Sequence, residues 1–167
     1  METKVTWKTD NELRRLLVFH ECSCLVLSAP GIASPDAKTV LMLGGRGSTA
    51  TENNITDDAA APFRRELLRR GYIVLCPDCG PDNWGSPQAS RMVLQVLECL
   101  SAEGVPHTAR PLPVMGFSMG AVGALMFAVR HPERVSRIIS VFGAFDLADL
   151  RTRSEKLQSS IDSVYPT

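Results

Sequence analysis

The sequence predicts an α/β protein: a three-layer α/β/α sandwich around a mostly parallel sheet, in a single domain over residues 1–167. Two observations point to this class. Short apolar runs alternate along the chain with amphipathic stretches of helical length. The runs are apolar throughout, as in parallel strands that helices cover on both faces. With 44% hydrophobic residues, a chain of 167 residues can bury one core of useful size.

The apolar runs give the expected strands in chain order. After a weakly amphipathic start, these strands lie at residues 22–29, 39–43, 72–76, 112–115 and 135–142. Each is bounded by glycine, proline or small polar residues, which favour turns. The glycine-rich segment from Gly44 to Ser48 follows the second strand and is too rich in glycine for regular structure.

The helices are expected between these strands. Residues 57–70 carry acids in the first turn and arginines in the last, and Gly71 ends the helix. Ser86 is placed to cap the next helix, with Pro87 at its first position and Gly104 after its end. A third helix over residues 121–130 stops before Pro132, and the polar tail from residue 149 is partly helical.

The motif Gly116-Phe117-Ser118-Met119-Gly120 joins the fourth strand to the helix after it. A sharp strand-to-helix turn requires glycines on both sides of the serine, because side chains there would collide with the turn and the neighbouring strand. The turn exposes the Ser118 hydroxyl beside the Met119 N–H and the positive end of a helix. The alternative is a glycine-rich turn with a structural serine.

Other polar residues are expected at the same edge of the sheet as Ser118. Ligands bind at the carboxyl ends of strands in such sheets, where the segment 44–48, the loop 78–85 and Asp146 also fall. His107 precedes its strand and therefore lies at the opposite rim.

Composition excludes several classes of function. Basic and acidic residues balance at 18 each, which argues against nucleic-acid binding. No apolar stretch approaches the roughly 20 residues of a membrane span, and the N-terminus does not resemble a signal peptide. Five cysteines, an odd number, then favour reduced thiols and a cytoplasmic protein.

The cysteine pairs allow one further interpretation. Cys76 and Cys79 are spaced as Cys-x-x-Cys, and Cys22 with Cys24 could complete a four-thiolate zinc site. A redox pair should open a helix, whereas glycine and proline follow Cys79. Small buried side chains in strands are the competing interpretation.

The chain resembles the α/β-hydrolase superfamily from about residue 22 to about residue 147. The motif at Ser118 is similar to the nucleophile elbow of esterases and lipases in that family. The segment 43–48 is similar to its His-Gly-x-Gly oxyanion loop, with Gly44 in place of the histidine. Residues 72–78 and 131–135 are similar to two of its strand connections.

The resemblance implies a serine hydrolase of the carboxylesterase type that acts on a small ester without a cofactor or metal. Ser118 would be the acyl-accepting nucleophile, and the N–H groups of Met119 and Arg46 would form the oxyanion hole. Such donors contribute about 3 to 4 kcal/mol each to the transition state. Trp84 is expected either to line the substrate pocket or simply to cover the end of the sheet.

The sequence departs from the family pattern in its acid and base. The triad histidine should follow Ser118 on a late loop, but only His131 follows, about 18 Å away along a helix. Asp146 is either the acid or a capping aspartate. We therefore expect a sheet truncated after about the sixth strand, in a chain that is incomplete at its C-terminus and poorly active by itself. The alternative function is a catalytically silent, hydrolase-like binding module or gene fragment.

An incomplete sheet would leave the strand at residues 135–142 without its outer neighbour. Unpaired apolar edges recruit other chains. We therefore expect a homodimer through this strand, aggregation, or cover from the polar tail.

Overall fold

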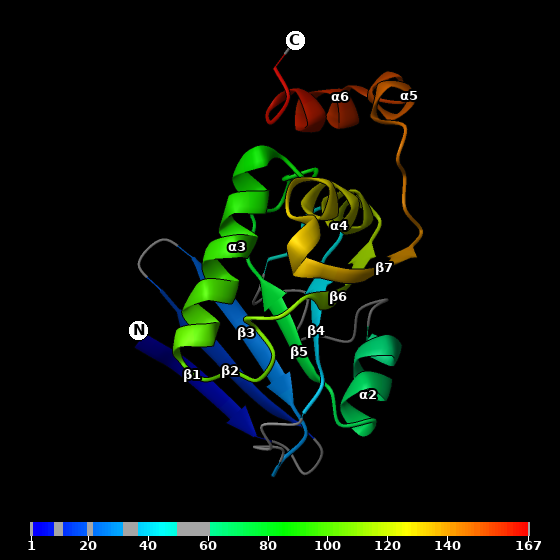
Figure 1. Cartoon of the computed structure of the whole chain (residues 1–167). Helices are drawn as coiled ribbons and strands as arrows, with labels where there is room; N and C mark the ends of the chain where they lie inside the picture. The colour runs from blue at the N-terminus through cyan, green and yellow to red at the C-terminus, as the bar shows by residue number, and fades with distance from the viewer. Residues whose placement is uncertain (1, 9–11, 20–21, 32–36, 50–60, 167) are drawn as a thin grey trace.

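The computed structural model describes all residues except 1, 9–11, 20–21, 32–36, 50–60 and 167, and it confirms the predicted α/β class (Figure 1). The strands are β1 (Glu2–Lys8), β2 (Leu13–Val18), β3 (Ser23–Ser28), β4 (Thr39–Leu43), β5 (Ile73–Pro77), β6 (Leu112–Phe117) and β7 (Val135–Val141). The helices are α2 (Ala61–Arg69), α3 (Pro87–Ala102), α4 (Met119–Arg130), the short 3₁₀ helix η1 (Pro132–Arg134), α5 (Leu147–Thr152) and α6 (Glu155–Asp162).

The seven strands of the described sheet lie in the order β1-β2-β3-β5-β4-β6-β7. The half containing β5, β4, β6 and β7 is parallel, whereas β1, β2 and β3 form an antiparallel meander that joins it through β3 and β5. Strands β1 and β2 were not expected, because residues 1–21 read only as a weakly amphipathic start. In β2, Arg14 and Arg15 precede the buried pair Leu16 and Leu17, so neither an apolar run nor a period of two marks the strand.

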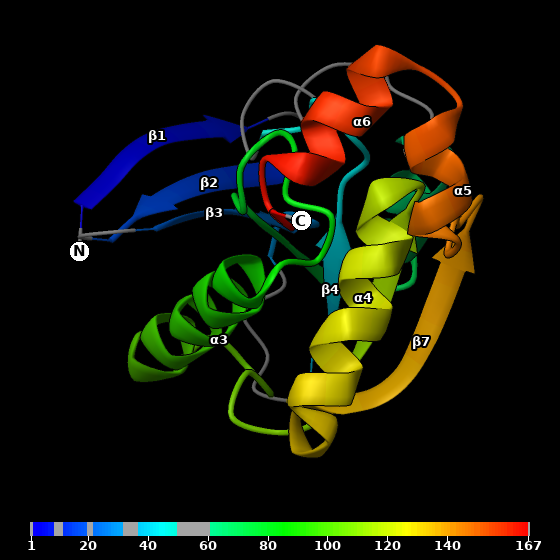
Figure 2. The same cartoon turned by 90° about the horizontal axis from the view of Figure 1, so that it is seen from above.

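Helices cover the two faces of the sheet and divide the core into two layers (Figure 2). On one face, α3 and α4 bury an apolar cluster that includes Val96, Leu97 and Phe127 against the inner strands. On the other face, α2 contributes Leu68 to a second cluster with Met42 and Phe117. This division is the expected three-layer arrangement.

The described helices begin close to the predicted positions. The Ser86 hydroxyl accepts a hydrogen bond from the Ala89 N–H at 3.2 Å, which confirms the predicted cap of α3. Helix α4 begins at Met119, two residues earlier than expected, directly after the Ser118 turn. Residues 57–60 of the predicted second helix lie outside the described residues.

The C-terminal tail folds into α5 and α6 and packs at the carboxyl end of the strands (Figure 2). Ile161 of α6 is 4% exposed, in a small cluster with Trp84 and Met119. Within the described ranges, none of the helices combines the length and the apolar character that crossing a bilayer requires.

Strand β7 is the last strand of the described sheet and stays largely exposed. Ile138 and Ile139 are 39% and 37% exposed, so apolar surface is accessible on both faces of the strand. The apolar side chains of the tail pack on Trp84 and Met119, and β7 keeps its exposed residues. The strand therefore combines a free edge with apolar side chains.

We expect the chain to self-associate through β7, because an apolar edge strand offers unpaired N–H and C=O groups to a second copy. Sedimentation should show dimers or larger species that Ile139→Lys shifts to monomer. Leu125→Lys is the control, because Leu125 is an equally exposed apolar residue at 39% but lies on α4. A monomer with or without the lysine at position 139 would show that the edge does not drive association.

Candidate active site

Ser118 is an exposed residue at the turn between β6 and α4. Its backbone has φ 50° and ψ −115°, a conformation that costs free energy for a residue with a side chain. The Ser118 N–H donates to the carbonyl of Val141 at 2.9 Å, so the end of β7 holds the turn. The structure thus presents the Ser118 hydroxyl at the carboxyl edge of the parallel strands, as the motif predicts.

Two glycines allow this turn to pack directly against backbone. A Cβ atom on Gly116 would lie 2.1 Å from the carbonyl oxygen of Gly120. A Cβ atom on Gly120 would lie 2.2 Å from the carbonyl oxygen of Leu43 and 2.5 Å from that of Gly44. Since real Cβ atoms do not approach so closely, both positions require glycine, and α4 rests on the end of β4.

The segment from Gly44 to Ser48 lies beside Ser118. A Cβ atom on Gly45 would be 3.7 Å from the Ser118 Cβ atom, so the two residues are neighbours. Hydrogen bonds from the Gly47 N–H to the Pro81 carbonyl at 2.7 Å and from the Ser48 N–H to the Gly45 carbonyl at 3.1 Å hold this segment. It is therefore fixed both internally and to the loop after β5.

The two N–H groups expected to form the oxyanion hole are available. Within the part of the chain that the structure describes, neither the Arg46 N–H nor the Met119 N–H has a recorded hydrogen-bond acceptor. Met119 is the first residue of α4, where a backbone N–H has no partner inside the helix. The Arg46 guanidinium instead faces Asp82, with the nearest N–O pair 3.8 Å apart.

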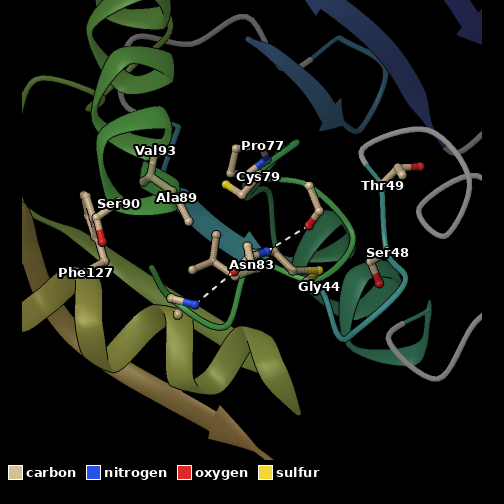
Figure 3. A pocket seen from close by; sticks show the side chains of 15 residues that line it. Gly44, Ser48, Thr49, Pro77, Cys79, Asn83, Ala89, Ser90, Val93 and Phe127 are labelled. Carbon is tan, nitrogen blue, oxygen red and sulfur yellow. Dashed lines mark hydrogen bonds between the residues drawn. The ribbon is translucent and has the colours of Figure 1, made fainter. Parts of the chain in front are cut away.

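A small cavity lies between this edge and α3 (Figure 3). Its volume is about 20 Å³, room for one water molecule, and Ser118 is not among its lining residues. Asn83 projects into it and is held by hydrogen bonds to the Gly80 carbonyl and from the Gly85 N–H. A wider open groove of about 470 Å³ lies between Arg46, Asp82 and α6.

Trp84 lies beneath α6 with only 3% of its surface exposed. Its indole N–H donates to the Ser160 hydroxyl at 2.7 Å, and it does not line the cavity of Figure 3. This placement corresponds to the second expected role, a residue that covers the end of the sheet. Contact between Trp84 and substrate remains a prediction.

The described histidines do not lie beside Ser118. His131 follows the last residue of α4, and its ring lies 5.1 Å from the ring of Phe127. His107 lies on the loop before β6, at the opposite rim of the sheet. His20 lies outside the described residues. The carboxylate of Asp146 accepts a hydrogen bond from the Asp149 N–H at 2.9 Å and so caps α5. A role for Asp146 as the acid of a catalytic triad remains a prediction.

The cysteines do not form a shared metal centre. Cys24 belongs to the core on the α3 and α4 face, whereas Cys76 belongs to the core on the α2 face. Burial raises the pKa of the Cys79 thiol to about 12, and burial likewise raises the pKa of Cys24 well above its usual value, so both stay protonated. Among the described residues, no group of three or more His, Cys, Asp or Glu side chains is placed to hold a metal ion.

Comparison with known structures identifies the fold. An S-formylglutathione hydrolase from Agrobacterium tumefaciens superimposes with a TM-score of 0.72 at 16% identity, over 98% of this chain and 68% of that one. A cold-adapted esterase from an Arctic intertidal metagenomic library gives 0.61 at 18% identity, over 96% and 74% of the two chains. Residues 79–150 match the family described as putative esterase.

The chain has an α/β-hydrolase-like fold. A hydrolase from Cupriavidus pinatubonensis (strain JMP 134 / LMG 1197), named 2-hydroxy-6-oxononadienedioate/2-hydroxy-6-oxononatrienedioate hydrolase, is 33% identical over 121 residues. The aligned region is 64% of this chain and 36% of that protein, so the chain spans little more than a third of the length of this curated relative.

Gly120→Ala should destabilise the chain by about 1 to 3 kcal/mol, because the new methyl group collides with the backbone of β4. The free energy of unfolding in urea measures this loss. Gly123→Ala is the matched control on the same helix. Its nearest neighbour would be the flexible end of Leu43 at 3.4 Å, so it should be neutral or stabilising. Equal effects of the two substitutions would contradict the close packing at Gly120.

Proposed function

We propose that this chain carries the nucleophile and the oxyanion hole of a serine hydrolase of the carboxylesterase type, with a small ester as substrate. The observation that carries the proposal is the exposed Ser118, held at φ 50° between β6 and α4 and next to Gly45 of the segment 44–48. The match of residues 79–150 to the putative esterase family supports the same reaction class.

The proposed chemistry is acyl transfer to Ser118. The Ser118 oxygen attacks the ester carbonyl carbon and gives up its proton, and the carbonyl oxygen becomes an oxyanion. The Met119 and Arg46 N–H groups donate hydrogen bonds to that oxyanion. Collapse breaks the bond to the alcohol, which leaves with a proton, and water then hydrolyses the acyl-serine to the acid and free serine.

The general base for these steps is not among the residues that the structure places near Ser118. His131 and His107 lie elsewhere, and no other histidine is described. Loss of the base from a serine triad lowers the rate about 10⁶-fold. The oxyanion hole and substrate binding alone still accelerate the reaction about 10³- to 10⁴-fold over the rate in water. We therefore propose that this chain by itself turns over esters very slowly.

The placement of His107 and His131 away from Ser118 also favours a second candidate function, which is ligand binding without catalysis. A hydrolase-like module that lacks a base could bind a small molecule at the same edge without turning it over. The two candidates differ in whether the Ser118 oxygen reacts when a base is supplied from outside.

Added imidazole should restore part of the missing proton transfer. We expect p-nitrophenyl acetate hydrolysis by this chain to be near background without imidazole, and to rise with imidazole more steeply than for Ser118→Ala. The Ser118→Ala chain is the matched control, since it accounts for hydrolysis by imidazole itself and by other surface groups.

Identical imidazole dependence in both chains would contradict the nucleophilic role of Ser118 and favour the binding module. Fast, Ser118-dependent hydrolysis without imidazole would show instead that another group of this chain serves as the base.

A further inference from the structure

We propose that Ser160 of α6 is a positioning residue that holds the oxyanion loop, here residues 44–48, in place through the loop after β5. The inference deepens the proposed function and rests on it for its catalytic meaning. The contacts themselves stand independently of whether Ser118 reacts.

The hydroxyl of Ser160 joins α6 to the loop after β5 by two hydrogen bonds. It donates to the Asp82 carboxylate at 2.7 Å and accepts from the Trp84 indole N–H at 2.7 Å. Ser160 and Trp84 are only 8% and 3% exposed, so water does not readily replace the bond between them, whereas the Asp82 carboxylate is partly exposed. A hydroxyl group is needed here because it both donates and accepts.

The same loop is bonded to the oxyanion loop. The Pro81 carbonyl, one residue before Asp82, accepts a hydrogen bond from the Gly47 N–H at 2.7 Å. The Asp82 carboxylate also lies 3.8 Å from the guanidinium of Arg46, the residue whose N–H is proposed to hold the oxyanion. A continuous set of contacts therefore runs from Ser160 through Asp82 and Pro81 to Gly47 and Arg46.

Apolar packing of Trp84 also joins α6 to the start of α4. The Trp84 side chain clusters with Met119, the second proposed oxyanion donor, and with Ile161, the neighbour of Ser160 on α6. Trp84 has φ 42°, a conformation that persists only where its surroundings impose it. The Tyr165 hydroxyl donates to the Trp84 carbonyl at 3.3 Å, so the C-terminal segment holds both the backbone and the side chain of this residue.

Removal of the Ser160 hydroxyl should therefore loosen the oxyanion loop. Ser160→Ala leaves the buried Trp84 indole N–H without its acceptor and removes the link from α6 to the half-exposed Asp82 carboxylate. Amide hydrogen exchange of Gly47, followed by NMR in the full chain, measures the result directly. We expect Gly47 to exchange about tenfold faster or more in Ser160→Ala. The Leu41 amide in the middle of β4 should stay protected, which separates local loosening from global unfolding.

Ser163→Ala is the matched control. Its hydroxyl donates to the Ser160 carbonyl at 2.7 Å, adjoins the same helix and has no recorded bond to the loop after β5. It should leave Gly47 exchange unchanged, and Ser160→Thr, which keeps the hydroxyl, should restore protection. Trp84→Phe removes the indole N–H and part of the ring, so it should also speed Gly47 exchange, which provides a second variant if Ser160→Ala folds poorly.

The imidazole-assisted hydrolysis of p-nitrophenyl acetate gives the functional readout. Ser160→Ala should lower the Ser118-dependent kcat several-fold with little change in KM, because a misplaced oxyanion donor acts on the transition state. If Ser118→Ala hydrolyses the ester equally well, the proposed function fails, while Gly47 exchange still tests the role of Ser160. Unchanged Gly47 protection in Ser160→Ala, or an equal change in Ser163→Ala, would overturn the proposal.

Discussion

The close contact between the start of α4 and the end of β4 is the constraint on which the carboxyl edge of this sheet depends. Gly120 packs against the Leu43 and Gly44 carbonyls, and Gly116 packs against Gly120, with no space for a Cβ atom at either glycine. This contact fixes the height of α4 above the sheet. As a consequence, Ser118 has to turn through a left-handed backbone conformation, which leaves its hydroxyl exposed.

Loops distant in sequence are assembled around that contact. The oxyanion loop follows β4 directly, so the packing of Gly120 on Leu43 also places Gly45 beside Ser118. The loop after β5 holds the oxyanion loop through the Pro81 carbonyl. Helix α6 in turn holds the loop after β5 through the hydrogen bond from Ser160 to Asp82. The C-terminal helices thus belong to the same edge of the molecule as the elbow, as Figure 1 shows.

The local parts of this arrangement could be predicted from the sequence. Glycines at fixed distances from Ser118 predict the turn, and the apolar runs predict the inner strands, because each signal lies within a few residues. The contacts of Ser160 could not be predicted, since its partners Asp82 and Trp84 lie 78 and 76 residues away and no local pattern marks them. Strands β1 and β2 escaped prediction for a different reason, since β2 places two arginines before its two buried leucines and shows neither an apolar run nor alternation.

The central claim is that Ser118 and the two N–H groups of Met119 and Arg46 form one acyl-transfer site. A crystal structure of the chain with phenylboronic acid tests it most directly, because boron bonds to a serine oxygen and becomes tetrahedral like the reaction intermediate. We expect a boron–oxygen bond to Ser118, with one boronate oxygen about 3 Å from both N–H groups. Boron bound elsewhere, or bound to Ser118 with its oxygens directed away from Arg46 and Met119, would contradict it.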